Sequence, residues 1–261
     1  MKHYIFLAVL ALFLFTQACE TAPEEVEATC LPTNISITLF QGSQSSKIIA
    51  DFYYIPDTEL LDHITWSNHQ THFFEYDTQN RLQVLRVIKV KDKVQEERWF
   101  EYNGLLVDRI NLVVRNLDYT YLEPVDSIFA GYLEYDYEGE NIKEEREYKI
   151  TDTEHLAELV MNTTFEYDER DNLISLTVLD LVEEKSSTMT MTYDESKHPY
   201  SALPYYFMGE SYVNNMLTRL ENDDFSYTYN QTLNEYEYPE TTYEKLGSAY
   251  TRIINYSYQC K

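Results

Sequence analysis

The side chains that most often bind metals stand in this sequence at spacings that do not suit a site. His63, His69 and His72 form the only histidine cluster. In an extended strand the first two would share a face and His72 would point to the other, which is poor geometry for a metal. The Asn-Asp-Asp run at 222–224 offers oxygens to calcium, but it lacks the spacing of a calcium loop and is more typical of a turn. We therefore expect no metal and no cofactor.

Motifs for catalysis are also missing from the sequence. It contains no Gly-x-Ser-x-Gly elbow, no His-Glu-x-x-His pair, no phosphate-binding glycine loop and no Cys-x-x-Cys. The 45 acidic residues guarantee close carboxylate pairs by chance, so spacing does not select the pair that a glycoside hydrolase would need. We expect a protein that is not an enzyme, and we name no catalytic residue.

The three cysteines are the strongest candidates for covalent chemistry, and the first follows an export signal. Lys2 and His3 make a short basic start, and Tyr4 to Phe15 is an unbroken apolar run of twelve residues. A helix needs about 20 apolar residues to cross a bilayer, so this run is too short for a membrane span. Its length is typical of a signal peptide, which we assign to residues 1–18.

The segment Thr16-Gln17-Ala18-Cys19 resembles the lipobox of bacterial lipoproteins. This resemblance implies cleavage before Cys19 and a lipid on its thiol, although Thr16 stands where leucine is usual. The alternative is ordinary cleavage after Ala18, which would leave a soluble periplasmic protein. Residues 19–29 are rich in Glu and Pro and are expected to form a flexible tether. An acidic stretch at this place also resembles the surface-export signal of Bacteroidota-type lipoproteins, and it implies a lipid-anchored protein of the outer membrane or cell surface.

Cys30 and Cys260 remain as a pair once Cys19 carries lipid. Disulfides persist in oxidising compartments, so we predict a bridge between them. Cys260 is in phase with the apolar residues of the last segment, whereas Pro32 prevents the alternation from assigning Cys30 to a face. The alternatives are two buried free thiols or, if Cys19 carries no lipid, a different pairing altogether.

Composition indicates how many domains the rest of the chain forms and which partners it excludes. Residues 30–261 contain no Gly/Ser-rich linker, so we expect a single domain. The net charge of the whole chain is -25, which repels phosphate backbones and makes nucleic acid an unsuitable partner. The 25 tyrosines favour half-buried pleated sheets.

Alternation of apolar and polar residues with a period of two runs through most of this domain. Met189, Met191 and Tyr193 alternate with threonines, for example, which is typical of antiparallel strands with one wet face. We predict an all-β fold in which an antiparallel meander of hairpins forms a curved sheet or barrel of at least ten strands. One short connector helix is expected at Thr151–Asn162, because a capping box precedes its apolar residues. A long excursion that contains a helical turn is expected between Pro199 and Leu220.

A degenerate repeat gives the meander its unit. Phe74-Glu75-Tyr76-Asp77 is followed by leucines six and nine residues after the tyrosine, and Phe165-Glu166-Tyr167-Asp168 is followed by leucines at the same offsets. Looser copies include Tyr193-Asp194 and Tyr229-Asn230. Each copy predicts a strand that ends on the tyrosine and a turn closed by Asp or Asn. Four residues after the tyrosine stand residues that tolerate positive φ, namely Asn80, Gly139 and Asp171.

These units resemble the YD repeats of large secreted shell-forming proteins. The chain is also similar to Bacteroidota-type lipoproteins that carry a domain of unknown function described as porin-like in fold. That resemblance covers most of the mature chain and rests on the lipobox, the Tyr-Asp units, the stretch 193–206, the pair Asn214-Asn215 and the closing strands around Tyr229 and Tyr256. It implies a fold and a location, and no activity.

Three functions fit this address and fold. The first is a lipid-anchored envelope protein that binds a glycan or peptide ligand, or acts as a scaffold, with aromatic side chains at the ligand. The second is a half-barrel that carries a lipid or acyl chain on an apolar concave face. The third is a carboxylate-dependent glycoside hydrolase. The membrane, reached through the lipid anchor, is the partner common to all three.

Replacing Cys19 with alanine should release the protein from the membrane fraction without unfolding it, because residues 19–29 are not expected to join the core. Detergent phase partitioning of both forms checks this. The wild-type protein should enter the detergent phase and C19A the aqueous phase; an aqueous wild-type protein would contradict lipidation.

Overall fold

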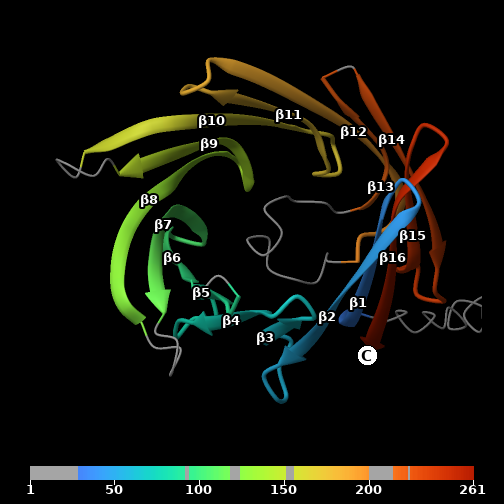
Figure 1. Cartoon of the computed structure of the whole chain (residues 1–261), viewed down its shortest axis with the longest axis horizontal. Helices are drawn as coiled ribbons and strands as arrows, with labels where there is room; N and C mark the ends of the chain where they lie inside the picture. The colour runs from blue at the N-terminus through green and yellow to red at the C-terminus, as the bar shows by residue number, and fades with distance from the viewer. Residues whose placement is uncertain (1–28, 92–93, 118–123, 151–155, 200–213, 223) are drawn as a thin grey trace, which may run out of the picture.

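The computed structural model is an all-β closed barrel. It describes residues 29–91, 94–117, 124–150, 156–199, 214–222 and 224–261, and these ranges contain sixteen strands and no helix. None of them therefore forms a helix long and apolar enough to cross a membrane. Every strand pairs antiparallel with the next, and β1 pairs with β16 to close the ring (Figure 1). The strands are β1 Cys30–Gln41, β2 Gln44–Tyr54, β3 Leu61–Trp66, β4 Gln70–Tyr76, β5 Leu82–Lys89, β6 Val94–Asn103, β7 Leu106–Leu117, β8 Pro124–Glu138, β9 Asn141–Ile150, β10 Ala157–Tyr167, β11 Leu173–Asp180, β12 Lys185–Lys197, β13 Asn214–Glu221, β14 Phe225–Leu233, β15 Pro239–Leu246 and β16 Ala249–Cys260.

The expected connector helix at Thr151–Asn162 is wrong. Ala157–Asn162 form the first half of β10, and residues 151–155 lie outside the described part of the chain. β10 pairs with β9 on one side and with β11 on the other, and Val160 is buried. Pairing on both edges outweighs the small gain from one capping box, and the Val and Thr residues here favour a strand.

The second expected break is also shorter than predicted. Asn214–Glu221 form β13, although the pattern placed residues up to Leu220 in an excursion. Residues 200–213 lie outside the described part, so the helical turn expected there is not described.

Side chains alternate between the inside and the outside of the barrel wall. On β12, Met189 and Met191 pack in the core, whereas Thr188, Thr190 and Thr192 are exposed. Because the convex side of a closed wall faces solvent, the buried apolar set lines the inside. The larger core cluster contains Ile35, Ala50, Phe52, Leu61, Ile64, Phe74, Leu82, Leu85, Val87, Phe100, Val107 and Ile110. A second cluster contains Leu173, Leu176 and Met191.

The Tyr-Asp units are confirmed as turns in two exact copies. The Asp77 side chain accepts the N–H groups two and four residues later at 2.8 and 3.0 Å. Asp168 accepts the equivalent groups at 2.8 and 2.9 Å. The predicted positive φ angles are present, at 61° for Asn80, 63° for Asp171 and 68° for Gly139. Each turn thus combines an Asx cap with a left-handed residue.

A tyrosine closes the open end of many hairpins, where the first strand begins and the second ends. We call this open end the mouth of the hairpin, and the mouths together form one rim of the barrel, the tyrosine rim. Main-chain pairing between the two strands stops short of the mouth, and the tyrosine hydroxyl donates to a main-chain carbonyl near the start of the first strand. These bonds are Tyr54 to Pro32 (2.7 Å), Tyr102 to Leu82 (2.7 Å), Tyr137 to Val107 (2.7 Å), Tyr193 to Leu173 (2.5 Å) and Tyr258 to Pro239 (2.8 Å).

The predicted strand ends are confirmed at two tyrosines and wrong at two others. Tyr76 ends β4 and Tyr167 ends β10. Tyr193 closes its mouth, but an irregular extension carries β12 beyond it to Lys197. Tyr229 lies inside β14, and the true turn is at Asn234, whose side chain accepts two N–H groups in the way that Asp77 does. The residue before that Asn is leucine, so the motif was not recognisable there.

The predicted disulfide joins the first and last strands. Cys30 lies opposite Cys260 in the β1–β16 ladder, and their Sγ atoms are bonded. A register shift between Pro32 and Asn34 brings Cys30 into phase with its partner, and this shift is why alternation did not place Cys30. Both ends of the barrel domain therefore meet at the tyrosine rim.

Tyr102→Phe should lower the free energy of unfolding by about 1 kcal/mol, because it removes one hydroxyl–carbonyl bond and leaves the Leu82 carbonyl unsatisfied. Urea denaturation of the purified protein checks this. Tyr53→Phe, at an exposed position of β2, is the control and should be neutral. Equal effects of the two substitutions would contradict a role for the mouth hydroxyl.

Candidate functional site

The residues that the sequence singled out do not gather into one site. Cys19 lies outside the described part, and Cys30 and Cys260 form the disulfide. His69 occupies the turn between β3 and β4 with a φ of 68°, so it does not share a strand face with His63 as expected. His72 lies on the inner side of the wall, where burial and nearby cationic side chains lower its pKa to about 4. Within the described ranges, no three His, Cys, Asp or Glu side chains are placed to hold a metal ion.

A cleft of about 600 Å³ lies at the mouth of the hairpin β9–β10. Main-chain pairing between the two strands ends at Glu144 opposite Thr164. The first residues of β9 and the last residues of β10 therefore diverge and leave space between them. Ile142 and Phe165 contribute apolar surface to this cleft, and Tyr167 lines it at the rim.

Carboxylates dominate the polar lining of the cleft. Glu138, Glu144, Glu166 and Asp168 line it together with Lys143. The Lys143 ammonium lies 3.6 Å from Glu138, and both side chains are well exposed. Glu144 is 3.3 Å from the guanidinium of the neighbouring Arg146. The cleft therefore presents an aromatic ring and an excess of negative charge to a ligand.

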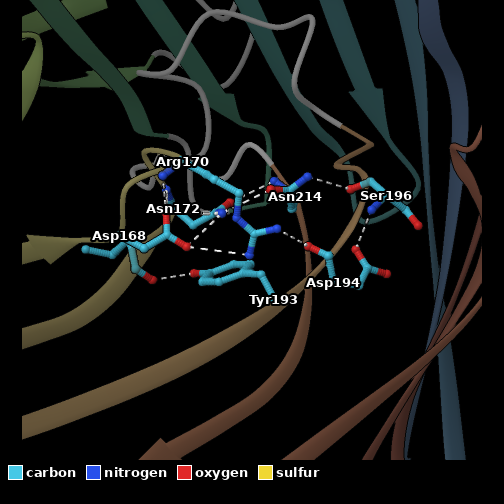
Figure 2. Close-up of polar contacts among 8 residues, drawn as sticks. Asp168, Arg170, Asn172, Tyr193, Asp194, Ser196 and Asn214 are labelled. Atoms are coloured by element: carbon cyan, nitrogen blue, oxygen red, sulfur yellow. Dashed lines mark hydrogen bonds and ion pairs between the residues drawn. The ribbon is translucent and has the colours of Figure 1, made fainter.

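Asp168 lines the cleft and also belongs to a network of hydrogen bonds in the turn between β10 and β11 (Figure 2). Its carboxylate accepts the Asn172 amide at 3.1 Å as well as the two turn N–H groups. Burial raises the pKa of Asp168, but the bonds from Asn172 and Arg170 and the charge of Arg170 outweigh it, so the pKa lies below its ordinary value of 3.8. This carboxylate is therefore held ionised.

The same network fixes strands that are distant in sequence. Asn172, which is fully buried, donates its side-chain amide to Asn214 Oδ1 at 3.0 Å and accepts the Asn214 N–H at 2.9 Å. The Asn214 side chain donates to the Ser196 carbonyl at 3.2 Å, and Arg170 reaches the Asp194 carbonyl at 3.5 Å (Figure 2). These bonds hold the start of β13 against the start of β11, where the β12 ladder is irregular. The strands beside the cleft are thereby linked to one another at the tyrosine rim.

A second cleft, of about 470 Å³, lies at the mouth of β15–β16 beside the disulfide. Tyr236, Tyr256 and Tyr258 line it together with Glu235 and Glu240. It repeats the combination of tyrosine and carboxylate at a second place on the rim.

Sequence reasoning did not identify either cleft. The residues that line the clefts are common types. They come together where the main-chain pairing between two strands ends, and composition does not predict that point. One usable signal was the turn before β9, where Gly139 and Glu140 replace the longer Asp-centred turn of the exact copies.

Among solved structures, the chain is similar in fold to a porin-like protein from Bacteroides vulgatus ATCC 8482. The TM-score is 0.55 over 88% of this chain and 99% of that chain, at 12% sequence identity. A porin-like protein from Bacteroides uniformis ATCC 8492 gives a TM-score of 0.33 at 12% identity over 87% of this chain and 98% of that chain. The complex TcdB2-TccC3-Cdc42 gives 0.26 at 12% identity over 84% of this chain and 11% of that chain. No protein-family model and no curated protein matches. The first of these likenesses shows a shared fold, as the porin-like resemblance implied, and the other two carry no argument.

Asp168→Asn should lower the free energy of unfolding at pH 7 by about 1 kcal/mol, because neutral hydrogen bonds replace charge-assisted ones. The carboxylate has a lowered pKa in the folded chain, so its contribution is complete above the ordinary value of 3.8 and is lost as pH falls through the lowered pKa. The gap between wild type and variant should therefore close below that value.

Urea denaturation at a series of pH values from neutral to acidic measures this gap. Glu169→Gln, an exposed residue of the same turn, is the matched control and should leave stability unchanged at every pH. A gap that stays constant down to the most acidic pH would show that the charge of Asp168 does not matter.

Proposed function

We propose that this chain is a lipid-anchored protein of the cell envelope, at the outer membrane or cell surface, and that it binds a glycan or peptide ligand in the β9–β10 cleft. The export signal at residues 1–18, the lipobox at Cys19 and the acidic tether at 19–29 support the location. The barrel begins at Cys30 on the tyrosine rim, so a tether of this length would hold that rim toward the membrane.

The outer wall of the barrel supports an anchored protein that stands in water. Phe100 on β6 belongs to the inner core cluster, so Glu97 falls on the outer side by alternation. Glu97 is itself buried there and accepts bonds from Trp99 at 3.0 Å, Arg115 at 3.1 Å and Arg86 at 3.3 Å. Farther round, Arg146 is 2.5 Å from Asp136. A barrel inserted in a bilayer needs a continuous apolar band on its outer face, and charged side chains there are costly. The lipid at Cys19 would then provide the attachment.

The β9–β10 cleft is the observation that carries the binding proposal. Its volume falls in the range of small-ligand sites, roughly 300 to 1,000 Å³. Tyrosine rings pack on apolar faces of sugars or on peptide side chains, and carboxylates accept hydrogen bonds from hydroxyl or N–H groups. We propose binding without turnover; Asp168 does not suit the role of general acid in glycoside hydrolysis, because its pKa is lowered, whereas that role needs a raised one.

The acyl-carrier alternative receives less support. It needs an open apolar concave face, but the described inner face near the tyrosine rim is a packed cluster in which Ile64, Leu61 and Val107 are fully buried. A scaffold role would need no cleft at all.

Glycan and peptide arrays probed with the C19A protein test the proposal. Binding to at least one class is expected, and it should fall in Glu166→Gln and persist in Glu240→Gln, which alters the other cleft. Bound glycans recovered intact by mass spectrometry would fit binding without hydrolysis. Loss of every signal, or equal signals in all three proteins, would refute ligand binding at this cleft.

A further inference from the structure

The outer face of β6–β9 carries exposed aromatic side chains. Phe100 and Ile110 belong to the inner core cluster, so Trp99 and Val113 point outward by alternation. Phe129 on β8 pairs with Val113 and therefore lies on the same face. The exposed fractions of Trp99 and Phe129 are 39% and 43%. Large aromatic side chains exposed together on one face are typical of a protein interface.

The register of the sheet places Trp99 in one row with two tyrosines. Across β6–β9 the row consists of Trp99, Asn111, Tyr132 and Tyr148. The two tyrosine rings stack with their centroids 4.6 Å apart, and the Arg109 guanidinium lies over the Tyr132 ring, 4.4 Å from its centroid. Trp, Tyr and Arg are the residues that contribute most often to binding energy at the centre of protein interfaces. This row therefore has the composition of an interface core.

The next row toward the tyrosine rim is charged, and its signs alternate. Across β6–β9 it consists of Glu101, Arg109, Glu134 and Arg146. Within the chain Arg109 pairs with Glu134, and Glu134 lies 4.0 Å from Arg146. The side chains of Arg109 and Glu134 remain 38% and 26% exposed. A second protein surface can therefore still reach both charges.

The alternation of signs makes the charged row complementary to itself. Rotation by 180° about an axis parallel to the strands, which lies between two copies of this face, reverses the order of the row. Arg109 of each copy then faces Glu134 of the other, and Trp99 faces Tyr148 in the aromatic row. Rotation about an axis along the row would instead place like charges opposite each other, which is unfavourable.

We propose that the outer face of β6–β9 is the interface of a symmetric dimer, in which a second copy of this chain binds through the same face. Burial of the aromatic side chains supplies the affinity, and the alternating charges fix the orientation. The axis parallel to the strands leaves the strand direction unchanged, so the tyrosine rims of both copies face the same side. This orientation suits two chains anchored in one membrane; that agreement rests on the proposed function, whereas the interface itself does not.

Sedimentation equilibrium of the C19A protein over a range of concentrations tests the inference, and a reversible monomer–dimer equilibrium is expected. Arg109→Glu should weaken dimerisation about tenfold, because the symmetry places like charges opposite each other twice in each dimer. Lys47→Glu makes the same change of charge at an exposed position of β2 and is the matched control, which should dimerise as wild type does. A monomer at every concentration would overturn the inference and leave this face to a different partner.

A mixture of two variants tests the symmetry. Arg109→Glu and Glu134→Arg each place like charges opposite each other in a homodimer, so each alone should dimerise weakly. Mixed in equal amounts they should form a heterodimer, because a negative face then meets a positive one at both central positions. Mixing cannot rescue a misfolded variant, so this experiment separates loss of the interface from loss of the fold. Failure of the mixture to dimerise, or equal dimerisation of Arg109→Glu and Lys47→Glu, would overturn the inference.

Phe129→Ser probes the same face without a change of charge. It removes exposed apolar surface and should also weaken dimerisation, so it decides the location if either charge reversal fails to fold. Dimerisation of Phe129→Ser equal to that of wild type would overturn the inference. Ligand binding in the β9–β10 cleft is measured separately on the arrays, and its absence would leave the dimer interface standing.

Discussion

The hydrogen bond from a tyrosine hydroxyl to a main-chain carbonyl, present at the mouths of five hairpins, is the interaction on which this barrel depends. Strands that twist around a closed ring splay where no turn joins them, and the splayed residues lose their ladder bonds. A buried carbonyl left without a partner destabilises the fold by an amount comparable to a lost hydrogen bond. Tyr102 spans that gap to Leu82 because its side chain is long, flat and ends in a donor. Burial raises the pKa of Tyr54 and Tyr258, so these hydroxyls remain protonated donors at neutral pH.

This constraint also explains the closure of the ring. An even number of strands brings the start of β1 and the end of β16 to the same rim, and the disulfide joins Cys30 to Cys260 there. The seam between the first and last strands joins residues that are far apart in sequence: Cys30 and Cys260 are separated by 230 positions. A covalent link over so long a loop restricts the unfolded chain, and the chain-entropy model assigns it about 5 kcal/mol. The tyrosine rim is therefore the end of the barrel at which its first and last strands are covalently joined.

Much of the fold could be predicted from the sequence because its determinants are local. Period-two alternation identifies strands such as β12, and Asp with a left-handed residue three positions later identifies the turns at Asp77 and Asp168. What could not be predicted depends on pairing across the sheet. Ala157–Asn162 carry apolar residues at helical spacing, and only their two neighbouring strands make them extended. The cleft could not be predicted for the same reason. It begins where main-chain pairing between β9 and β10 ends, and no local sequence pattern marks that point.

Degeneracy of the repeat is what allows the hairpin mouths to differ from one another. The long Asp77 turn places Arg81 directly before β5, where its stem can cross the mouth and its charge can meet Tyr102. The turn before β9 is one residue shorter, since Glu138 pairs with Asn141 around Gly139 and Glu140, whereas Asp77 bonds to Arg81 around three residues. A neutral, short side chain then stands at the mouth and turns toward Asp171. This difference between the turns does not involve the hydrogen bonds between Asn172 and Asn214, which join the starts of the nearby strands β11 and β13. A change in one turn can therefore be accommodated at the rim without weakening the closed ladder that supports it.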